Sequence, residues 1–346
     1  WLPSNYSFTS TPTTSVTMQR KPINSYTWSG TNQATYTGST INILDAPYNL
    51  KATPVGVASG DTVTPTYSGN TATNYSASGY TIQVTAISNA NYIYVAGATD
   101  RTHTWYILRA TLVLSSVSNI TKVYDGLDTY TGSFIRGTHY TTTCATAAAI
   151  DVNYTSITFA SANAGTHTVT ISGVTPTNSN YQMSQASYSF PGAGTITKKA
   201  LTLSWNGSAS YEYNAGKQGP TFSITNSVGE SLSYQINVLQ GTGVYFHNDT
   251  EPLGAGGSRT CAPATAYGVK AINCGSYEVE VVLLSTTNYT LSTSSFEWEI
   301  TKKKLTISWS GNASYEYNAQ MQGPTFSITN SLGESLSYQI NVLEGT

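Results

Sequence analysis

Residues 198–242 read KKALTLSWNGSASYEYNAGKQGPTFSITNSVGESLSYQINVLQGT, and residues 302–346 read KKKLTISWSGNASYEYNAQMQGPTFSITNSLGESLSYQINVLEGT. The two stretches agree at 37 of 45 positions, at an offset of 104 residues. A repeat of this length is typical of a chain that copies one structural unit in tandem. The repeat is rich in Thr, Tyr, Ile and Val that alternate with polar residues, which is the pattern of half-buried β-strands. The sequence therefore predicts an array of β-rich modules.

A first short signature recurs along the whole chain, and it consists of a strand that ends in Tyr followed by a tight turn. Asp and Asn side chains bond to their own backbone in turns, and Gly permits positive φ angles. The signature occurs as Tyr36-Thr37-Gly38, Tyr124-Asp125-Gly126, Tyr213-Asn214-Ala215 and Tyr317-Asn318-Ala319. Its recurrence predicts the same turn near the start of every module.

A second signature marks the other end of each module. A Gly opens an alternating strand, and Asn-Tyr follows with an apolar residue two positions further on. The dipeptide occurs as Asn91-Tyr92, Asn180-Tyr181 and Asn288-Tyr289, with a truncated copy at Asn5-Tyr6. Together the two signatures predict where the modules begin and end.

The predicted organisation has five parts. They are the C-terminal end of a preceding module at 1–22, a divergent module at 23–107, a second module at 108–197, a third at 198–301, and the first half of a fourth at 302–346. Only Thr197-Lys198-Lys199 and Thr301-Lys302-Lys303 lie between the later modules, so we expect neighbours to stack with limited freedom. The incomplete modules at both ends indicate a fragment of a longer protein.

Composition restricts the function classes. Charged residues make up 9% of the chain and the net charge is −2, so clustered Lys and Arg for nucleic-acid or membrane-surface binding are missing. No apolar run reaches the length of a membrane span, and we expect no membrane insertion. At 39% hydrophobic and 12% aromatic residues, the chain has enough apolar side chains for several small cores, which argues against disorder.

The fold class that follows is all-β. Alternation at period two is clear in residues 166–171 and 277–281, and turn-forming clusters separate the strands. No segment of ten or more residues has the pattern of an amphipathic helix, although residues 144–150 favour a short helical turn. Each module should therefore be a mostly-β unit of about six or seven strands.

The residues resemble a known family. Val123-Tyr124-Asp125-Gly126 resembles the turn of the YDG domain of bacterial surface proteins. The order of Tyr turn, Gly-led strand and Asn-Tyr strand is similar to the related MBG modules, which repeat in very large adhesins. The resemblance covers essentially the whole chain, and only module 23–107 departs from the pattern, with Thr37 in the middle of its turn. It implies β-grasp-like or immunoglobulin-like modules in a secreted, surface-attached protein, and it carries no catalytic residues to transfer.

The search for chemistry gives no catalytic, cofactor or metal site. His103, His139, His167 and His247 are scattered, and none has a partner at metal-ligand spacing. Calcium sites need several clustered oxygen ligands, whereas the joints carry Lys. A Ser or Cys nucleophile needs a base beside it, and the near-duplicated segment contains no His. We therefore expect no enzyme and no cofactor.

The three cysteines are Cys144, Cys261 and Cys274. Cys261 and Cys274 lie 13 residues apart in one module, and we predict a disulfide between them, which fits an oxidising compartment. Cys144 is expected to be a small buried apolar residue.

Aromatic residues recur at fixed places in the modules. Trp28, Trp205 and Trp309 share one position, while Trp105 and Trp298 share another. Recurrence at fixed positions favours core packing over stacking on a ligand such as a sugar. The residues predicted to define the module are Tyr124, Asp125, Gly126, Asn180, Tyr181, Trp205, Tyr213, Tyr277, Asn288, Tyr289, Trp309 and Tyr317.

The leading functional hypothesis is a stalk, spacer or surface-fibre segment of a large secreted adhesin on a bacterial cell surface. Its partners would be neighbouring modules of the same chain, and a secretion or cell-envelope anchoring complex could hold the whole protein. A second hypothesis is a multivalent array that binds host or surface glycans or matrix. A third is a passenger segment carried by a secretion or anchoring machine.

Overall fold

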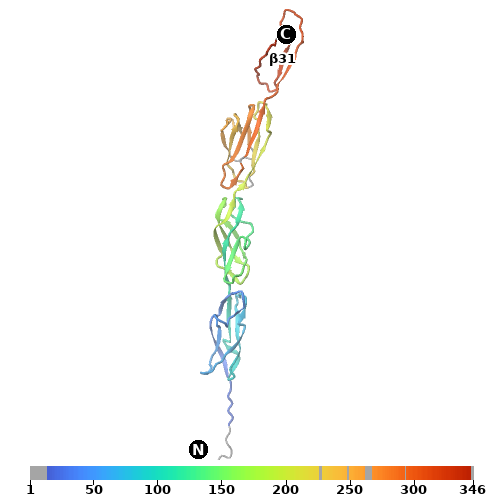
Figure 1. The fold of residues 1–346 in the computed structure, drawn as a ribbon. Coiled ribbons are helices and arrows are strands. Elements are labelled where there is room, and N and C mark those ends of the chain that lie inside the picture. Colours follow the sequence, from blue (N-terminus) through green and yellow to red (C-terminus); the bar gives the residue numbers. More distant parts are fainter. Residues whose placement is uncertain (1–13, 226–227, 248, 262–266, 293, 344–346) are drawn as a thin grey trace, which may run out of the picture. The chain divides into compact units, whose positions relative to one another are not determined.

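The computed structural model describes residues 14–225, 228–247, 249–261, 267–292 and 294–343, without the side chain of Cys261. The described residues form strands and turns and no helix, so none of them forms a helix that could cross a membrane (Figure 1). Residues 14–20 form no strand, and the first 13 residues of the predicted tail at 1–22 lie outside the described part. The all-β prediction is confirmed.

The chain divides into two compact units, each described by itself. One unit contains residues 1–120, 129–160 and 167–194, and the other contains residues 121–128, 161–166 and 195–346. The division passes through the second predicted module. Its segments 121–128 and 161–166 belong with the residues that follow, which means that they pack with the third module.

The first module comprises nine strands. They are β1 (Lys21–Ser29), β2 (Gln33–Thr35), β3 (Ile41–Asn42), β4 (Lys51–Pro54), β5 (Pro65–Ser68), β6 (Thr71–Ala72), β7 (Tyr80–Ile87), β8 (Tyr92–Thr99) and β9 (Thr102–Leu108). The sheet β4-β1-β8 and the sheet β2-β9-β7-β5 enclose a core that contains Ile23, Tyr26, Ile82, Val84 and Trp105. Inward residues alternate with outward ones along β7 from Tyr80 to Val84, as the pleat requires. In β1 a register irregularity between Ile23 and Ser25 interrupts the alternation, so that Ile23 and Tyr26, three positions apart, are both buried.

The second module also has nine strands in the described residues. They are β10 (Ala110–Val117), β11 (Ile120–Val123), β12 (Tyr140–Cys144), β13 (Val152–Asn153), β14 (Ser156–Phe159), β15 (Gly165–Ser172), β16 (Thr175–Pro176), β17 (Tyr181–Met183) and β18 (Ser187–Thr197). One sheet has the order β12-β10-β17, and β14 pairs with β15 so that Ile157 lies opposite Ile171. The predicted helical turn at 144–150 is wrong: β12 runs to Cys144, residues 145–146 turn, and Ala147 has a φ of 53°.

The third module has eleven strands in the described residues. They are β19 (Lys199–Ala200), β20 (Thr202–Asn206), β21 (Ser210–Glu212), β22 (Thr221–Thr225), β23 (Tyr234–Gln240), β24 (Tyr245–Phe246), β25 (Ser258–Cys261), β26 (Tyr267–Lys270), β27 (Gly275–Leu283), β28 (Tyr289–Thr290) and β29 (Ser294–Thr301). Two sheets, β20-β22-β26-β24 and β21-β29-β27-β23-β25, share one core around Phe222, Ile236, Val279 and Trp298. Two sheets around a shared core make a sandwich, which decides against the β-grasp alternative.

The fourth part is a hairpin of β30 (Thr306–Ser310) and β31 (Thr325–Thr329). Trp309 lies opposite Phe326 in it, just as Trp205 lies opposite Phe222 in the third module. The strand number per module exceeds the predicted six or seven because very short strands are added to the longer ones, such as β3 and β6, which form a two-stranded sheet of their own.

Parallel pairs put the two ends of each module side by side. The first strand of the module pairs in parallel with the Asn-Tyr strand, through Lys21–Tyr92, Ala110–Tyr181 and Lys199–Tyr289. The short strands β2 and β21 likewise pair in parallel with the last strands β9 and β29. This topology decides where the two sequence signatures lie.

Candidate functional site at the joints between modules

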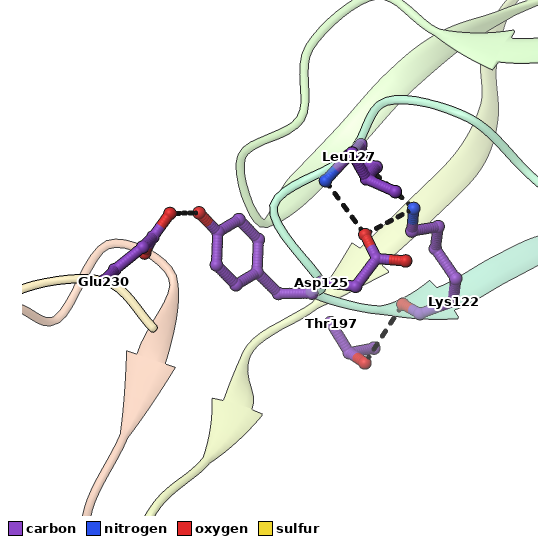
Figure 2. Close-up of polar contacts among 6 residues, drawn as sticks. Lys122, Asp125, Leu127, Thr197 and Glu230 are labelled. Carbon is purple, nitrogen blue, oxygen red and sulfur yellow. Dashed lines mark hydrogen bonds and ion pairs between the residues drawn. The ribbon is translucent and has the colours of Figure 1, made fainter. Parts of the chain in front are cut away.

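The Tyr turn is held by its own polar side chains. In Tyr124-Asp125-Gly126, Asp125 Oδ1 accepts a hydrogen bond from the Leu127 backbone N–H at 3.0 Å. The same oxygen forms an ion pair with Lys122 Nζ at 2.7 Å (Figure 2). Burial opposes ionisation of the carboxyl, but the bonds from Lys122 and Leu127 outweigh it and hold the pKa of Asp125 below its usual value. Gly126 takes the turn with a φ of 83°.

The other Tyr turns repeat this geometry with different side chains. The side-chain oxygen of the middle residue accepts a hydrogen bond from the backbone N–H two positions later. The donor and acceptor residues are Ser39 and Thr37 at 3.4 Å, Gly216 and Asn214 at 2.8 Å, and Gln320 and Asn318 at 3.0 Å. The third residue always has a positive φ, which is 85° at Gly38, 63° at Ala215 and 59° at Ala319. Sequence variation therefore leaves the shape of the turn unchanged.

The backbone of each Tyr turn is tied to the last strand of its own module. The N–H of Tyr36 donates to Leu108 O, that of Tyr124 to Thr197 O and that of Tyr213 to Thr301 O, each at 2.9 Å. These acceptors are the final residues of β9, β18 and β29, the last strand of each module. The Tyr turn, although early in the sequence of its module, thus lies at the C-terminal end of that module.

The Asn-Tyr dipeptide lies at the opposite end. The backbone carbonyl of the Asn accepts a hydrogen bond from the first strand of its own module. The N–H of Lys21 donates to Asn91 O, that of Ala110 to Asn180 O and that of Lys199 to Asn288 O, each at 2.9 Å. The Tyr turn of one module and the Asn-Tyr of the next therefore meet at the boundary between them. We call these boundaries the first joint (first and second modules), the second joint (second and third) and the third joint (third and fourth).

At the second joint, one carboxylate joins two tyrosines. The hydroxyl of Tyr124 donates to Glu230 Oε1 at 2.5 Å, and the hydroxyl of Tyr289 donates to Glu230 Oε2 at 2.6 Å. The two rings meet edge to face, with centroids 5.3 Å apart and an interplanar angle of 78°. Figure 2 shows Glu230 on the far side of the turn from the Asp125–Lys122 pair. Both phenol rings are buried, so the carboxylate satisfies hydroxyls that have little access to water.

The same contact shifts the pKa values of its members. The hydrogen bonds from Tyr124 and Tyr289 hold the pKa of Glu230 below its usual value of 4.5. The hydrogen bond to Glu230, together with burial, raises the pKa of Tyr124 above 10.0. The group is thus arranged for a charged carboxylate and neutral phenols near neutral pH.

The Asn of the Asn-Tyr dipeptide makes the second part of this joint. Asn288 Nδ2 donates to Asn163 Oδ1 at 3.0 Å, and the backbone N of Ala164 donates to Asn288 Oδ1 at 2.9 Å. Both Asn163 and Ala164 belong to the loop that precedes β15 of the second module. One amide side chain therefore satisfies both a donor and an acceptor of the neighbouring module.

The first joint uses the same two signatures. The rings of Tyr36 and Tyr181 meet edge to face at 5.4 Å and 79°. Asn180 Nδ2 donates to Asn74 Oδ1 at 3.0 Å, and the backbone N of Tyr75 donates to Asn180 Oδ1 at 2.8 Å. The geometry of the Asn contact is therefore the same at both joints.

Among the described residues, no carboxylate takes the place of Glu230 at the first joint. The hydroxyl of Tyr181 bonds instead to Thr146 Oγ1 at 2.8 Å. Beside them lies a hollow of 510 Å³, lined by residues that include Gln33, Tyr36, Tyr48 and Thr146. Arg109 adds a contact of another kind, with its guanidinium 4.2 Å from the centre of the Tyr75 ring.

The third joint repeats the carboxylate. The hydroxyl of Tyr213 donates to Glu334 Oε1 at 2.6 Å, and that bond raises the pKa of Tyr213. Glu334 occupies the place of Glu230 in the near-identical repeat. Lys303 Nζ also pairs with Glu212 Oε1 at 2.9 Å across this boundary.

Residues 109–188 match the family model of the YDG domain. The second module is of the YDG type. The match includes both the Tyr124-Asp125-Gly126 turn and Asn180-Tyr181, and it confirms the YDG resemblance predicted for this module. A search of the curated proteins finds no match.

Two solved structures are similar to the chain. The fibronectin(III)-like modules of CbhA from Clostridium thermocellum share 13% identity over 55% of this chain and 94% of that chain, with a TM-score of 0.22. Domains 1–6 of the surface layer protein SbsC share 12% identity over 88% of this chain, with a TM-score of 0.25, and the match spans 48% of that chain. At these scores the fold assignment rests on the strands and sheets of the chain itself.

The structure separates the predicted residues into two groups. Those at the joints are Tyr124, Asp125 and Gly126 of the YDG module with Asn180 and Tyr181, and Tyr213, Asn288 and Tyr289 of the third module. Tyr277 is a core residue stacked on Trp298, and Trp205 packs between Phe222 and Phe296.

Trp309 and Tyr317 are exceptions, since their exposed fractions are 63% and 93%. Residues 302–346 contain counterparts of β20 and β22 but none of β26, β27 and β29, which cover the equivalent face of the third module.

The cysteines are only partly described. Cys274 is exposed and forms no disulfide with a described side chain, but the side chain of Cys261 lies outside the described residues, so the disulfide between them stays a prediction. Cys144 is half-buried rather than buried. Burial disfavours its thiolate, but hydrogen bonds with Thr146 outweigh this and lower the pKa of Cys144. In the part of the chain that the structure describes, no group of three His, Cys, Asp or Glu residues is placed to hold a metal ion.

Sequence reasoning missed the residues that complete the joints, namely Glu230, Glu334, Thr146, Asn74 and Asn163. Two signals could have found some of them. Gly-Glu-Ser occurs in both copies of the long repeat, at 229–231 and 333–335, and Asn-x-Gly precedes a strand at both 163–165 and 273–275. A polar residue kept in a loop of a repeat suggests a contact outside its own module.

Proposed function

We propose that the chain is a spacer segment of a large secreted protein on a bacterial cell surface, without catalytic activity. In this proposal, tandem β modules separate a functional end of the protein from its anchor. The observation that carries it is the repeated joint, in which the Tyr turn of one module contacts the next module at three successive boundaries. An array that positions something at a distance needs such contacts, because independent modules on free linkers would not keep a direction.

The energetics of the joint suit this role. Hydrogen bonds to a charged group contribute about 1.5–3 kcal/mol, and exposure of Glu230 reduces this toward about 1 kcal/mol. Each module meanwhile keeps a core of its own, such as the one around Phe222 and Val279. Neighbour contacts of this size add to module stability and restrict rotation without making the modules dependent on one another.

The spacer proposal can be tested on the full chain. A pair of fluorescent labels, one in the YDG module and one in the third module, reports the distribution of distances across the second joint. We expect a narrow distribution that broadens in the double variant Glu230→Gln, Asn288→Ala. An equally broad distribution in the unchanged chain and the variant would refute the spacer role.

The location is a separate part of the proposal. An antibody against residues 198–301 should label intact cells that produce the protein. Labelling that requires lysis of the cells would exclude the surface location and leave the joints unaffected.

A second candidate function is favoured by one observation, the hollow at the first joint. Its lining contains Tyr36 and Tyr48 with hydroxyl and amide side chains and no charged residue, which is the chemistry that binds neutral sugars. The full chain should then bind a neutral glycan on an array, and Tyr48→Ala should abolish the binding. Absence of binding by the full chain rejects this candidate.

A further inference from the structure

The N-terminal end of the first module repeats the joint-forming surface of the later modules. Asn91 lies there as Asn180 does, with its carbonyl bonded to the first residue of β1. The local turn is also the same, because Asn91 N donates to Asn89 Oδ1 at 3.0 Å and Asn180 N donates to Asn178 Oδ1 at 2.9 Å. The backbone of the first module thus presents Asn91 in the orientation found at the first joint.

An acid occupies the place of Glu230 in this module. The hydroxyl of Tyr92 donates to Asp61 Oδ2 at 2.7 Å, as that of Tyr289 does to Glu230 Oε2. Asp61 lies in the loop after β4, which pairs with β1, and Glu230 lies in the loop after β22, which pairs with β20. The two carboxylates therefore have the same position in the topology of the module and the same tyrosine as a partner.

The remaining groups of this surface have no bond within the described residues. Asn91 is exposed and its side chain has no hydrogen bond there, whereas Asn180 and Asn288 each have two. Asp61 is exposed too, and its Oδ1 atom has no described donor, whereas both oxygens of Glu230 accept one. Arg20 precedes β1 in the position of Lys198 and Arg109.

We propose that Asp61 and Asn91 form a docking site for one further β module with the joint chemistry of the YDG module. The turn Tyr of that module donates to Asp61 Oδ1, as Tyr124 does to Glu230. A loop with an Asn side chain and a following backbone N–H, the counterpart of Asn163-Ala164, engages Asn91. We choose a module of this chemistry as the partner because it supplies what both residues need. Asp61 Oδ1, whose neighbour Oδ2 already bonds to Tyr92, needs a hydrogen-bond donor, and the Asn91 amide needs both a donor and an acceptor. The inference rests on the proposed function, since it assumes that these contacts serve to join modules.

The test adds the partner in its natural connection. Residues 109–198 are fused directly before Lys21 of the chain, so that Lys198 takes the place of Arg20. The added copy carries Ser161→Thr, which keeps a hydroxyl and gives its peptides a distinct mass. Hydrogen exchange is then measured for the loop 161–166 in both copies of the same protein.

The expected result is slow exchange at Ala164 in the added copy, because its N–H donates to Asn91. Asn91→Ala should accelerate that exchange about five- to tenfold, as the loss of one hydrogen bond predicts. Asp61→Ala should accelerate it as well, since the Tyr contact is then lost. Unchanged exchange of the amides of Ile82 and Val84 in β7 shows that the first module of each variant is still folded.

The native copy separates the two proposals. If Ala164 of the added copy exchanges at the same rate with and without Asn91→Ala, while the native copy responds to Asn288→Ala, the docking site is wrong and the joints stand. If neither copy responds to its Asn variant, the joint contacts themselves are wrong, and the proposed function fails with them.

Discussion

The first and second joints contain the same Tyr pair and the same Asn contact, but they differ in the residue between the tyrosines. Glu230 has two oxygens and bonds to both Tyr124 and Tyr289. Thr146 is shorter and bonds to Tyr181 from its own module. The second joint therefore has a polar link across the boundary where the first has a hollow of 510 Å³.

The first joint compensates by other means. Asn180 is 9% exposed, whereas Asn288 is half-buried, and Arg109 lies over the Tyr75 ring. A hydrogen bond is more costly to lose where water cannot replace it. We conclude that the first joint depends chiefly on its Asn and the second chiefly on its carboxylate, and this difference can be tested.

The largest effect is expected from Asn180→Ala. It removes two hydrogen bonds and leaves the Tyr75 N–H and the Asn74 side chain without partners, which should cost about 2 kcal/mol of local stability. Hydrogen exchange at Tyr75 measures that cost. Asn288→Ala, measured at Ala164, should cost about 1 kcal/mol because its site is more exposed. Equal costs at both joints would contradict the comparison.

Glu230→Gln should come next, with a loss of about 1–1.5 kcal/mol at the second joint. The amide has only one good acceptor oxygen, so one of the two Tyr hydroxyls loses its partner. The matched change at the first joint is Thr146→Val, which removes the bond to Tyr181 and the weaker one to Cys144 Sγ and should cost about 1 kcal/mol. Exchange at Ala164 and Tyr75 reports the two joints separately. A larger loss for Thr146→Val would reverse the assignment.

Gly126→Ala should destabilise its turn by about 1 kcal/mol, because an L-residue at a φ of 83° is strained. Gly38→Ala carries the same strain at 85°. A Cβ on Gly126 would also lie 3.3 Å from Val228 Cγ1 in the next module, whereas one on Gly38 meets nothing within 4 Å. Only Gly126→Ala should therefore increase exchange at Ala164 across its joint. An effect of Gly38→Ala on Tyr75 exchange of the same size would show that turn strain alone is responsible.

The smallest effect is the pH dependence of the second joint. The pKa of Glu230 is lowered from 4.5, so its contribution is complete above that pH and is lost as the pH falls through the folded value. The pKa of Tyr124 is raised from 10.0, so its contribution is present below that pH and is lost as the pH rises through the folded value. Exchange at Ala164, corrected for intrinsic rates, should be slowest between these limits. Hydrogen exchange at Tyr75 in the first joint should not accelerate at low pH for this reason, because Thr146, which stands there in place of Glu230, does not titrate.

The repeat and the strand pattern made the fold predictable. Trp205, Tyr277 and Trp298 recur or alternate in the sequence because the pleat places them in a core, and the all-β class follows from that periodicity. The joint was harder to predict. The Tyr turn and Asn-Tyr are far apart within a module, and only the parallel pairs show that they lie at its opposite ends.

Glu230 shows why the rest could not be predicted. Within a single copy of the repeat Glu230 resembles any exposed loop acid, because both of its partners are distant in sequence and one belongs to the preceding module. Only the recurrence of Gly-Glu-Ser at 229–231 and 333–335 marks it. The interpretation of Tyr124 and Asn180 as packing residues of one module was too narrow for the same reason.

The parallel pairing that puts Asn-Tyr at one end of a module and the Tyr turn at the other has a consequence for inheritance. Each module carries one complementary half of the contact at either end, as the third module does with Tyr289 and Tyr213. A duplication or deletion of one 104-residue period in the coding DNA therefore restores a complete contact at the new boundary. The number of modules can therefore change by recombination between near-identical stretches such as 198–242 and 302–346, without any further substitution at the joints.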